Sequence, residues 1–233
     1  MIAYKFLGPG RTALYSGSVW PLEGWVEADG PLALCRNGVH ASRGGDLPGW
    51  LNDELWVVEL DGELEEEGDV VFARRGRLVR NVDTWDGKAA LAFAESCVRR
   101  MHYQAVSALE VVGRVEDAAR LARARDLDEI QTLVLEIGGT ESAPDQLLVL
   151  LADAVQLIRG GRPDTYGPVL GNGAPTPGAV AANAGFVVAH AFGMAAVEAA
   201  GDEEVYAAAA EAERARQRDW LRAHLRLEAY APA

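Results

Sequence analysis

Residues 54–60 read Glu-Leu-Trp-Val-Val-Glu-Leu and give the clearest β-strand signal in the chain. β-Branched and aromatic side chains, which are enriched in strands, make up much of this stretch. The Asp61-Gly62 pair that follows is typical of a hairpin turn. Beyond the acidic run 63–69, which we interpret as a solvated turn, residues 70–82 indicate one or two further strands. This region therefore predicts a mostly antiparallel sheet.

The sheet extends towards the N-terminus through shorter segments. Strand-like stretches precede residue 54 at residues 2–7, 20–28, 32–35 and 39–40. Ser42 is expected to cap a short helix that runs from Asp46 to Leu51. Together these signals predict a twisted sheet of four to six strands with one short helix.

The spacing of apolar residues changes to a helical period at about residue 86. Asp126 and Glu129 resemble a capping box, and Thr176-Pro177 is a strong start signal for an alanine-rich helix. Because strands and helices are segregated along the chain, the sequence predicts an α+β protein. We expect a strand-rich module over residues 1–83 and a bundle of about five helices over residues 84–233.

A Gly/Pro-rich loop lies inside the helical half. Residues 160–178 contain ten Gly or Pro among nineteen positions, and long loops of this kind are usually functional or mobile. In the helix that follows, Asn183 and His190 share one face. These side chains either pack between helices or form a polar patch in a ligand pocket, with Tyr166 of the loop closing over it.

Composition excludes several classes of function. The net charge of −13 over 233 residues argues against sequence-independent nucleic-acid binding and against an anionic membrane surface as partner. Residues 178–200 are nearly uncharged but mostly Ala and Gly, so a buried helix is expected there rather than a membrane span. No signal peptide is visible and two cysteines make no disulfide framework, which predicts a cytoplasmic protein.

The most distinctive motif is Gly38-Val39-His40-Ala41, which we expect at a strand end before the short helix. One interpretation is structural: Gly38 supplies a positive φ, and His40 hydrogen-bonds to neighbouring backbone. The other is functional, because loops at strand ends carry sites and a helix N-terminus attracts anions.

This motif and the segments after it, Asp46-Leu47-Pro48 and residues 55–63, resemble an actinobacterial family of uncharacterised proteins. The N-terminal module of that family is similar to phage and bacterial domains of unknown function with a Gly-Phe-His-Ala-Cys box. This chain has Ser42 where many relatives have cysteine, so a role of that thiol does not transfer. A looser similarity is to the ADP-ribosyltransferase-like fold, which implies Tyr4, Ser42 and Glu59 as site candidates.

Two functions remain open. The first is a binding or interaction protein that recognises a small molecule or a protein partner, with Arg36, Ser42, Tyr166 and Asn183 as candidate contacts. The second is an enzyme with its site at the junction of sheet and helices, where His40 or His190 acts as acid or base near Arg36 or Glu59. The histidines and cysteines show no metal-ligand spacing, so no metal site is expected, and no cofactor is assigned.

Overall fold

The structure is a computed structural model that describes residues 1–34, 36–44, 47–68, 70–138, 145–160 and 175–230. It confirms the α+β class: a five-stranded antiparallel sheet is followed by helices. Two compact units are present. The sheet unit comprises Met1–Ala90, Thr176–Ala182 and Arg218–Ala233, and the helical unit comprises Leu91–Pro175 and Asn183–Gln217. The predicted domain boundary at residues 83/84 stays a prediction, since the compact units interleave along the chain.

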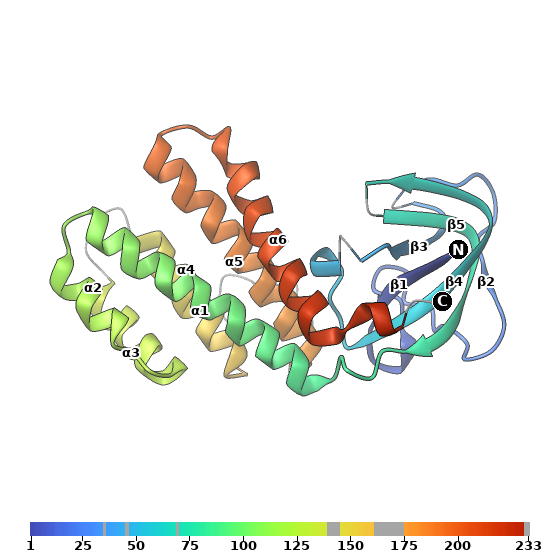
Figure 1. The fold of residues 1–233 in the computed structure, drawn as a ribbon, viewed down its shortest axis with the longest axis horizontal. Coiled ribbons are helices and arrows are strands. Elements are labelled where there is room, and N and C mark those ends of the chain that lie inside the picture. The colour runs from blue at the N-terminus through green and yellow to red at the C-terminus, as the bar shows by residue number, and fades with distance from the viewer. Residues whose placement is uncertain (35, 45–46, 69, 139–144, 161–174, 231–233) are drawn as a thin grey trace. The chain divides into compact units, whose positions relative to one another are not determined.

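The strands of the sheet unit pair in a closed ring. They are β1 (Ile2–Leu7), β2 (Val26–Glu27), β3 (Val39–Ser42), β4 (Glu54–Glu67) and β5 (Val70–Asn81). β3 pairs with β1 and β5, and β4 also pairs with β1 and β5, all antiparallel. The long strands β4 and β5 run side by side through a strong bend (Figure 1). Such a ring encloses the side chains that point inward, as small barrels do.

The predicted hairpin turn at Asp61-Gly62 is wrong. β4 continues through these residues to Glu67, and its register against β5 shifts between Asp61 and Leu64. Gly62 has φ +81°, and a Cβ built there would lie 2.8 Å from the Cβ of Arg74. The Asp-Gly pair therefore marks a β-bulge that bends the strand instead of a turn that ends it. The acidic run consequently lies largely in a paired strand and not in a turn.

The helix predicted from Ser42 is also wrong in its described part. Ser42 is the last residue of β3, and its Oγ accepts a hydrogen bond from Gly44 N at 3.1 Å. The later residues form a single 3-10 turn, Leu47–Gly49. Asp46 lies outside the described residues. The serine thus closes a local turn after the strand. A serine hydroxyl can form either this kind of turn or a helix cap, so the residue type alone does not tell them apart.

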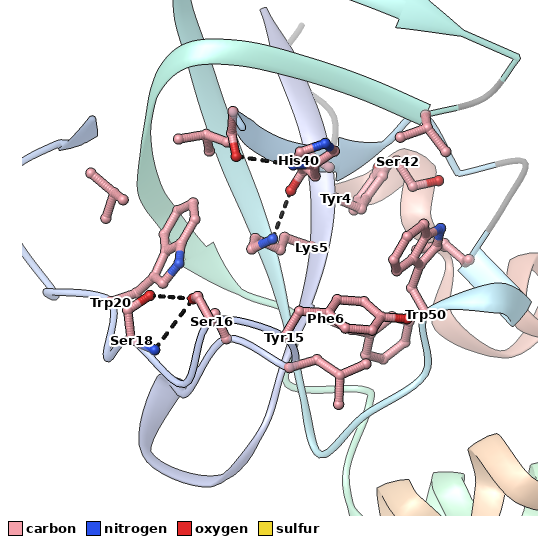
Figure 2. Close-up of a pocket in the computed structure, with 18 of the residues that line it drawn as sticks. Tyr4, Lys5, Phe6, Tyr15, Ser16, Ser18, Trp20, His40, Ser42 and Trp50 are labelled. Carbon is pink, nitrogen blue, oxygen red and sulfur yellow. Dashed lines mark hydrogen bonds between the residues drawn. The ribbon is translucent and has the colours of Figure 1, made fainter. Parts of the chain in front are cut away.

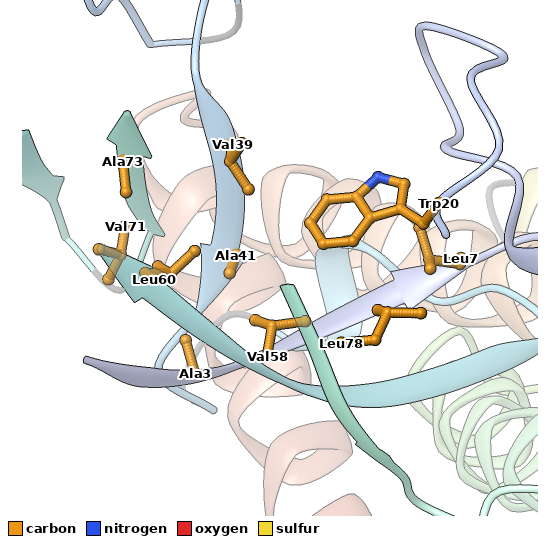
Figure 3. Packing of buried hydrophobic residues seen from close by; sticks show 10 residues of the cluster. All are labelled: Ala3, Leu7, Trp20, Val39, Ala41, Val58, Leu60, Val71, Ala73 and Leu78. Atoms are coloured by element: carbon orange, nitrogen blue, oxygen red, sulfur yellow. The ribbon is translucent and has the colours of Figure 1, made fainter. Parts of the chain in front are cut away.

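Strand alternation accounts for the core of the sheet unit. Its buried apolar cluster is drawn in Figure 3 and consists of Ala3, Leu7, Trp20, Val39, Ala41, Val58, Leu60, Val71, Ala73 and Leu78. Most members lie two or four residues from another member on the same strand, as Val39 and Ala41 do in β3. Successive side chains of a strand point to opposite faces, so each strand contributes every second residue to the core. Lys5 stands between Ala3 and Leu7 on the same side of β1.

Six α-helices occupy the described residues after the sheet, where about five were predicted. They are α1 (Gly87–Val111), α2 (Val115–Ala122), α3 (Leu127–Ile137), α4 (Asp145–Ile158), α5 (Pro177–Ala200) and α6 (Val205–Leu225). The predicted cap at Asp126 is confirmed, since its carboxylate accepts a hydrogen bond from Glu129 N at 2.9 Å. Gly138 follows the last residue of α3 as its C-cap.

α5 is long and apolar enough to cross a membrane by length and composition alone, and 56% of its most apolar window is buried in the structure. The core helix of a protein without any membrane contact passes the same test. This helix is therefore weak evidence for a membrane span.

A buried polar cluster lies within the helical unit. The carboxylate of Glu213 has no exposed side-chain area and forms a bidentate pair with Arg100, at 2.6 Å from Nη2 and 3.0 Å from Nε. Gln217 Nε2 donates to Glu213 and to the carbonyl of Gly185. Burial raises the pKa of the Cys97 thiol to about 12. Cys97 is therefore a core residue and not a reactive thiol.

The start of α5 is anchored to the loop before β4 inside the sheet unit. Thr176 Oγ1 accepts from Ala179 N at 3.2 Å, which confirms the predicted cap. Asp53 receives hydrogen bonds from Thr176 Oγ1 at 2.7 Å and from Gly178 N at 3.0 Å. A carboxylate at a helix N-terminus is favoured by the free N–H groups there. A Cβ built on Gly178 would lie 2.3 Å from the backbone carbon of Asn52.

Replacing Gly178 by alanine is expected to destabilise the protein by about 1–3 kcal/mol, because the new methyl group meets backbone atoms that cannot rotate away. Helix propensity alone predicts the opposite sign, a gain of up to about 1 kcal/mol. Urea unfolding followed by circular dichroism measures the difference. Ala199→Gly, at an exposed position of the same helix, calibrates the propensity. A Gly178→Ala protein that is more stable than the parent contradicts this packing.

Candidate functional site

A pocket of about 450 Å³ opens in the sheet unit. Its walls come from β1, β3, residues 13–20 and the turn around residues 47–50 (Figure 2). Residues 13–20 form an irregular loop held by backbone bonds such as Ala13 N to Ser18 O at 2.8 Å. The pocket is thus built on one side from strands, which are rigid, and on the other from loops.

Lys5 presents its ammonium group at the wall of this pocket. Nζ donates to the backbone carbonyl of His40 at 2.7 Å and lies 5.2 Å from the ring centroid of Trp20 (Figure 2). Burial lowers the pKa of Lys5 to about 8. The alternation that makes Ala3 and Leu7 core residues places a lysine between them, so the charge is held largely away from water.

The imidazole ring of His40 contacts Gly38 and Phe72. Nδ1 lies 2.9 Å from the carbonyl oxygen of Gly38, and the ring stacks on Phe72 with centroids 5.4 Å apart. Since a carbonyl only accepts, Nδ1 carries the proton and Nε2 holds the lone pair when the ring is neutral. Burial lowers the pKa of His40; the bond to Gly38 opposes this effect and the charge of Lys5 adds to it.

The structural interpretation of the Gly-Val-His-Ala box is confirmed in both parts. Gly38 has φ +138°, and His40 bonds to neighbouring backbone. The expected position before a helix is wrong, because residues 39–42 form β3 in the interior of the sheet. His40 nevertheless lines the pocket, so it has a structural role and is also a candidate site residue.

Aromatic side chains form much of the pocket wall. Trp20 is buried, whereas Tyr15 is 82% exposed. The rings of Tyr15 and Trp50 meet edge to face with centroids 6.0 Å apart (Figure 2). Flat aromatic walls with a few polar groups are the common lining of small-molecule sites.

The predicted site residues are divided between the two units. In the sheet unit, Arg36, His40 and Ser42 all line the pocket, and so does Tyr4, which pairs with Ser42 in the β1–β3 ladder. Glu59 does not line it.

Glu59 lies on β4 between the core residues Val58 and Leu60, and its carboxylate pairs with Arg77 at 2.6 Å. Alternation thus turns it away from the interior of the ring. The candidate set Tyr4, Ser42 and Glu59 suggested by the ADP-ribosyltransferase-like similarity is therefore only partly brought together.

The other candidates lie in the helical unit or outside the described residues. Asn183 is buried in α5. Nδ1 of His190 bonds to the hydroxyl oxygen of Tyr206 at 2.7 Å, and its ring lies parallel to that of Phe186. Neither Asn183 nor His190 lines the pocket of the sheet unit. Tyr166 and most of the 160–178 loop fall outside the described residues.

Within the described ranges, no group of three or more His, Cys, Asp or Glu side chains is placed to hold a metal ion. No protein-family model, curated protein or solved structure matches the chain. The resemblance to an actinobacterial family stays a prediction, and the pocket itself carries the functional argument.

Lys5 was missed as a site residue by sequence reasoning, together with Trp20, Trp50 and Tyr15. A signal for Lys5 was present: it occupies an otherwise apolar face of a strand, in a chain with only two lysines. The aromatic residues gave no such signal. They come from loops whose paths local sequence does not determine.

Proposed function

We propose that this protein binds a small organic molecule with a flat apolar body and an anionic group in the pocket of the sheet unit. The observation that carries the proposal is the position of the Lys5 ammonium group at the wall of an aromatic-lined pocket of about 450 Å³. That volume falls in the usual range for small-ligand sites.

The charges at the pocket favour an anion. Among the described residues, neither Lys5 nor Arg36 forms an ion pair with a carboxylate. Burial lowers the pKa of Lys5, and no acidic group among the described residues raises it again. A buried cation is costly unless it is paired, so an anionic group of a ligand would relieve that cost. Two N–H donors of Lys5 remain for such a group beyond the one bonded to His40.

A pair of fluorescent probes tests this proposal. 8-Anilinonaphthalene-1-sulfonate carries an anionic sulfonate, whereas N-phenyl-1-naphthylamine has the same aromatic body without it. We expect one site per chain that prefers the sulfonate. Lys5→Met is expected to weaken binding of the sulfonate about tenfold and to change binding of the neutral probe much less, because charge-assisted hydrogen bonds are the stronger ones. Fluorescence titration measures both affinities.

Tyr15→Ala is expected to weaken binding of both probes to a similar extent, because it removes an aromatic ring from the pocket wall and no charge. Tyr103→Ala is the matched control, since Tyr103 is also a largely exposed tyrosine and does not line the pocket. Equal binding to the parent, Lys5→Met and Tyr15→Ala proteins contradicts the proposed site.

The remaining aspects of the proposal concern surroundings and partners. The net charge of −13 supports a partner other than nucleic acid or an anionic membrane surface. We also propose a cytoplasmic location. A small molecule is favoured over a protein partner because the pocket is concave.

A further inference from the structure

The two lysines of the chain differ in their surroundings. Lys88 is exposed in the first turn of α1. Lys5 is held in the pocket by the carbonyl of His40 and by the face of Trp20, which keep Nζ at one place on the wall. A lysine held in a largely apolar site is the usual form of an amine that attacks carbonyl carbons. Arginine cannot take this role because it does not lose its proton.

We propose that Lys5 forms a reversible Schiff base with an aldehyde group of a ligand bound in this pocket. The inference rests on the proposed function, since the ligand must first occupy the pocket. It adds covalent chemistry to that site and names the substrate class, a flat aromatic aldehyde that also carries an anionic group. When Lys5 reacts with the aldehyde, Arg36, which lines the same pocket, is left to hold the anionic group.

The reaction balances without an oxidant or reductant. The lone pair of the neutral amine forms a C–N bond to the carbonyl carbon, and the carbonyl oxygen gains a proton as the nitrogen loses one, which gives a carbinolamine. Loss of its hydroxyl group with the remaining N–H proton releases one water and leaves the C=N bond. Addition of water reverses both steps and restores the lysine.

The pocket supports the first step in two ways. The carbonyl of His40 keeps Nζ oriented by accepting one hydrogen bond from it. In the neutral amine, this bond leaves the second N–H group and the lone pair of Nζ available. The low pKa of Lys5 provides a neutral amine in a useful fraction of molecules near neutral pH. Among the described residues, the other titratable or charged side chains that line this pocket are Tyr4, Tyr15, Arg36 and His40, none of which is acidic at neutral pH.

Reductive trapping tests the inference. The protein is incubated at pH 7 with 4-formylbenzoate and cyanoborohydride, which converts an imine into a stable secondary amine. Intact-mass and peptide analysis then count and locate the adducts. We expect one adduct per chain on Lys5, formed at least about tenfold faster than any adduct on Lys88, given the larger neutral fraction of an amine of low pKa. Lys5→Arg should abolish the fast adduct, and Lys88→Arg should leave it unchanged.

Displacement of 8-anilinonaphthalene-1-sulfonate separates the two proposals. 4-Methylbenzoate has a similar shape and no aldehyde, so both benzoates should displace the probe from the parent and from Lys5→Arg, which also shows that this variant is folded. If the benzoates displace the probe but the trapped adducts are spread equally over Lys5, Lys88 and the Met1 amine, the Schiff-base proposal is overturned and the proposed function still stands. Displacement by neither compound overturns both.

Discussion

Lys5 is expected to be the first lysine of the chain to be acetylated when trace acetic anhydride is added at pH 7. Only a neutral amine reacts, and burial lowers the pKa of Lys5 to about 8 from an ordinary value of 10.5. About one Lys5 side chain in ten is then neutral at pH 7, compared with fewer than about one in a thousand for an ordinary lysine. The lower basicity of Lys5 offsets part of this advantage, so we expect a rate ratio on the order of ten over Lys88.

The pH dependence gives the sharper result. The rate at Lys5 should rise as pH increases, pass its half-maximum near pH 8 and then level off, because above its pKa the amine is already neutral. Lys88 serves as the reference in the same sample, and peptide mass spectrometry with isotopic labels measures both rates. A rate at Lys5 that still increases steeply between pH 9 and 10 contradicts a buried amine of low pKa.

The strands and caps that the sequence predicted correctly are those with strong local signals. β1 matches the expected residues 2–7, and the caps at Asp126 and Thr176 follow from side-chain chemistry within one helical turn. Such features depend on interactions between residues close in sequence, which local patterns report well.

The two wrong predictions, the turn at Asp61-Gly62 and the helix cap at Ser42, have the same physical cause, which is pairing between strands distant in sequence. Asp61-Gly62 has turn chemistry, but pairing with β5 on the far side of the bend keeps the strand continuous and converts the pair into a bulge. Ser42 has capping chemistry, but residues 39–42 are taken into the ring between β1 and β5. In both places tertiary hydrogen bonds override a local preference.

The candidate site was partly visible for the same reason. His40, Arg36 and Ser42 lie in or beside a distinctive motif and do line the pocket. Lys5 is distant from them in sequence, and only the β1–β3 pairing and its bond to His40 bring it there. Glu59 was a candidate but does not line the pocket. The sequence did not show that the strands close into a ring, so the direction of each β4 side chain could not be predicted.

Replacing Glu213 by alanine is expected to destabilise the protein by about 3–5 kcal/mol, the usual cost of removing one partner of a buried ion pair. The side chain of Glu213 has no exposed area and that of Arg100 is only 22% exposed, so the variant leaves a guanidinium without its bidentate acceptor. Gln217 loses a hydrogen-bond acceptor as well. Urea unfolding followed by circular dichroism measures the change.

The chain offers a matched control on α1. Glu95 and Arg99 form an i,i+4 pair at 2.6 Å whose side chains are 43% and 42% exposed. Glu95→Ala is expected to cost no more than about 0.5 kcal/mol, because water already solvates both charges. The two substitutions remove the same chemical group from arginine pairs of equal length, so burial and the further contacts of Glu213 with Gln217 and Arg216 separate their effects.

A double variant shows whether Glu213→Ala loses stability because the ion pair is lost or because the charge of Arg100 is left unpaired. Removing both partners as Arg100→Met with Glu213→Leu takes away the uncompensated guanidinium, and apolar side chains of similar volume fill its place. We expect this variant to be more stable than Glu213→Ala, because the main cost of the single change is the charge left behind. If Glu213→Ala costs no more than Glu95→Ala, the buried pair of the helical unit is not formed as described. If the double variant is the less stable of the two, the pair itself contributes net stability through its bidentate geometry and its bond to Gln217.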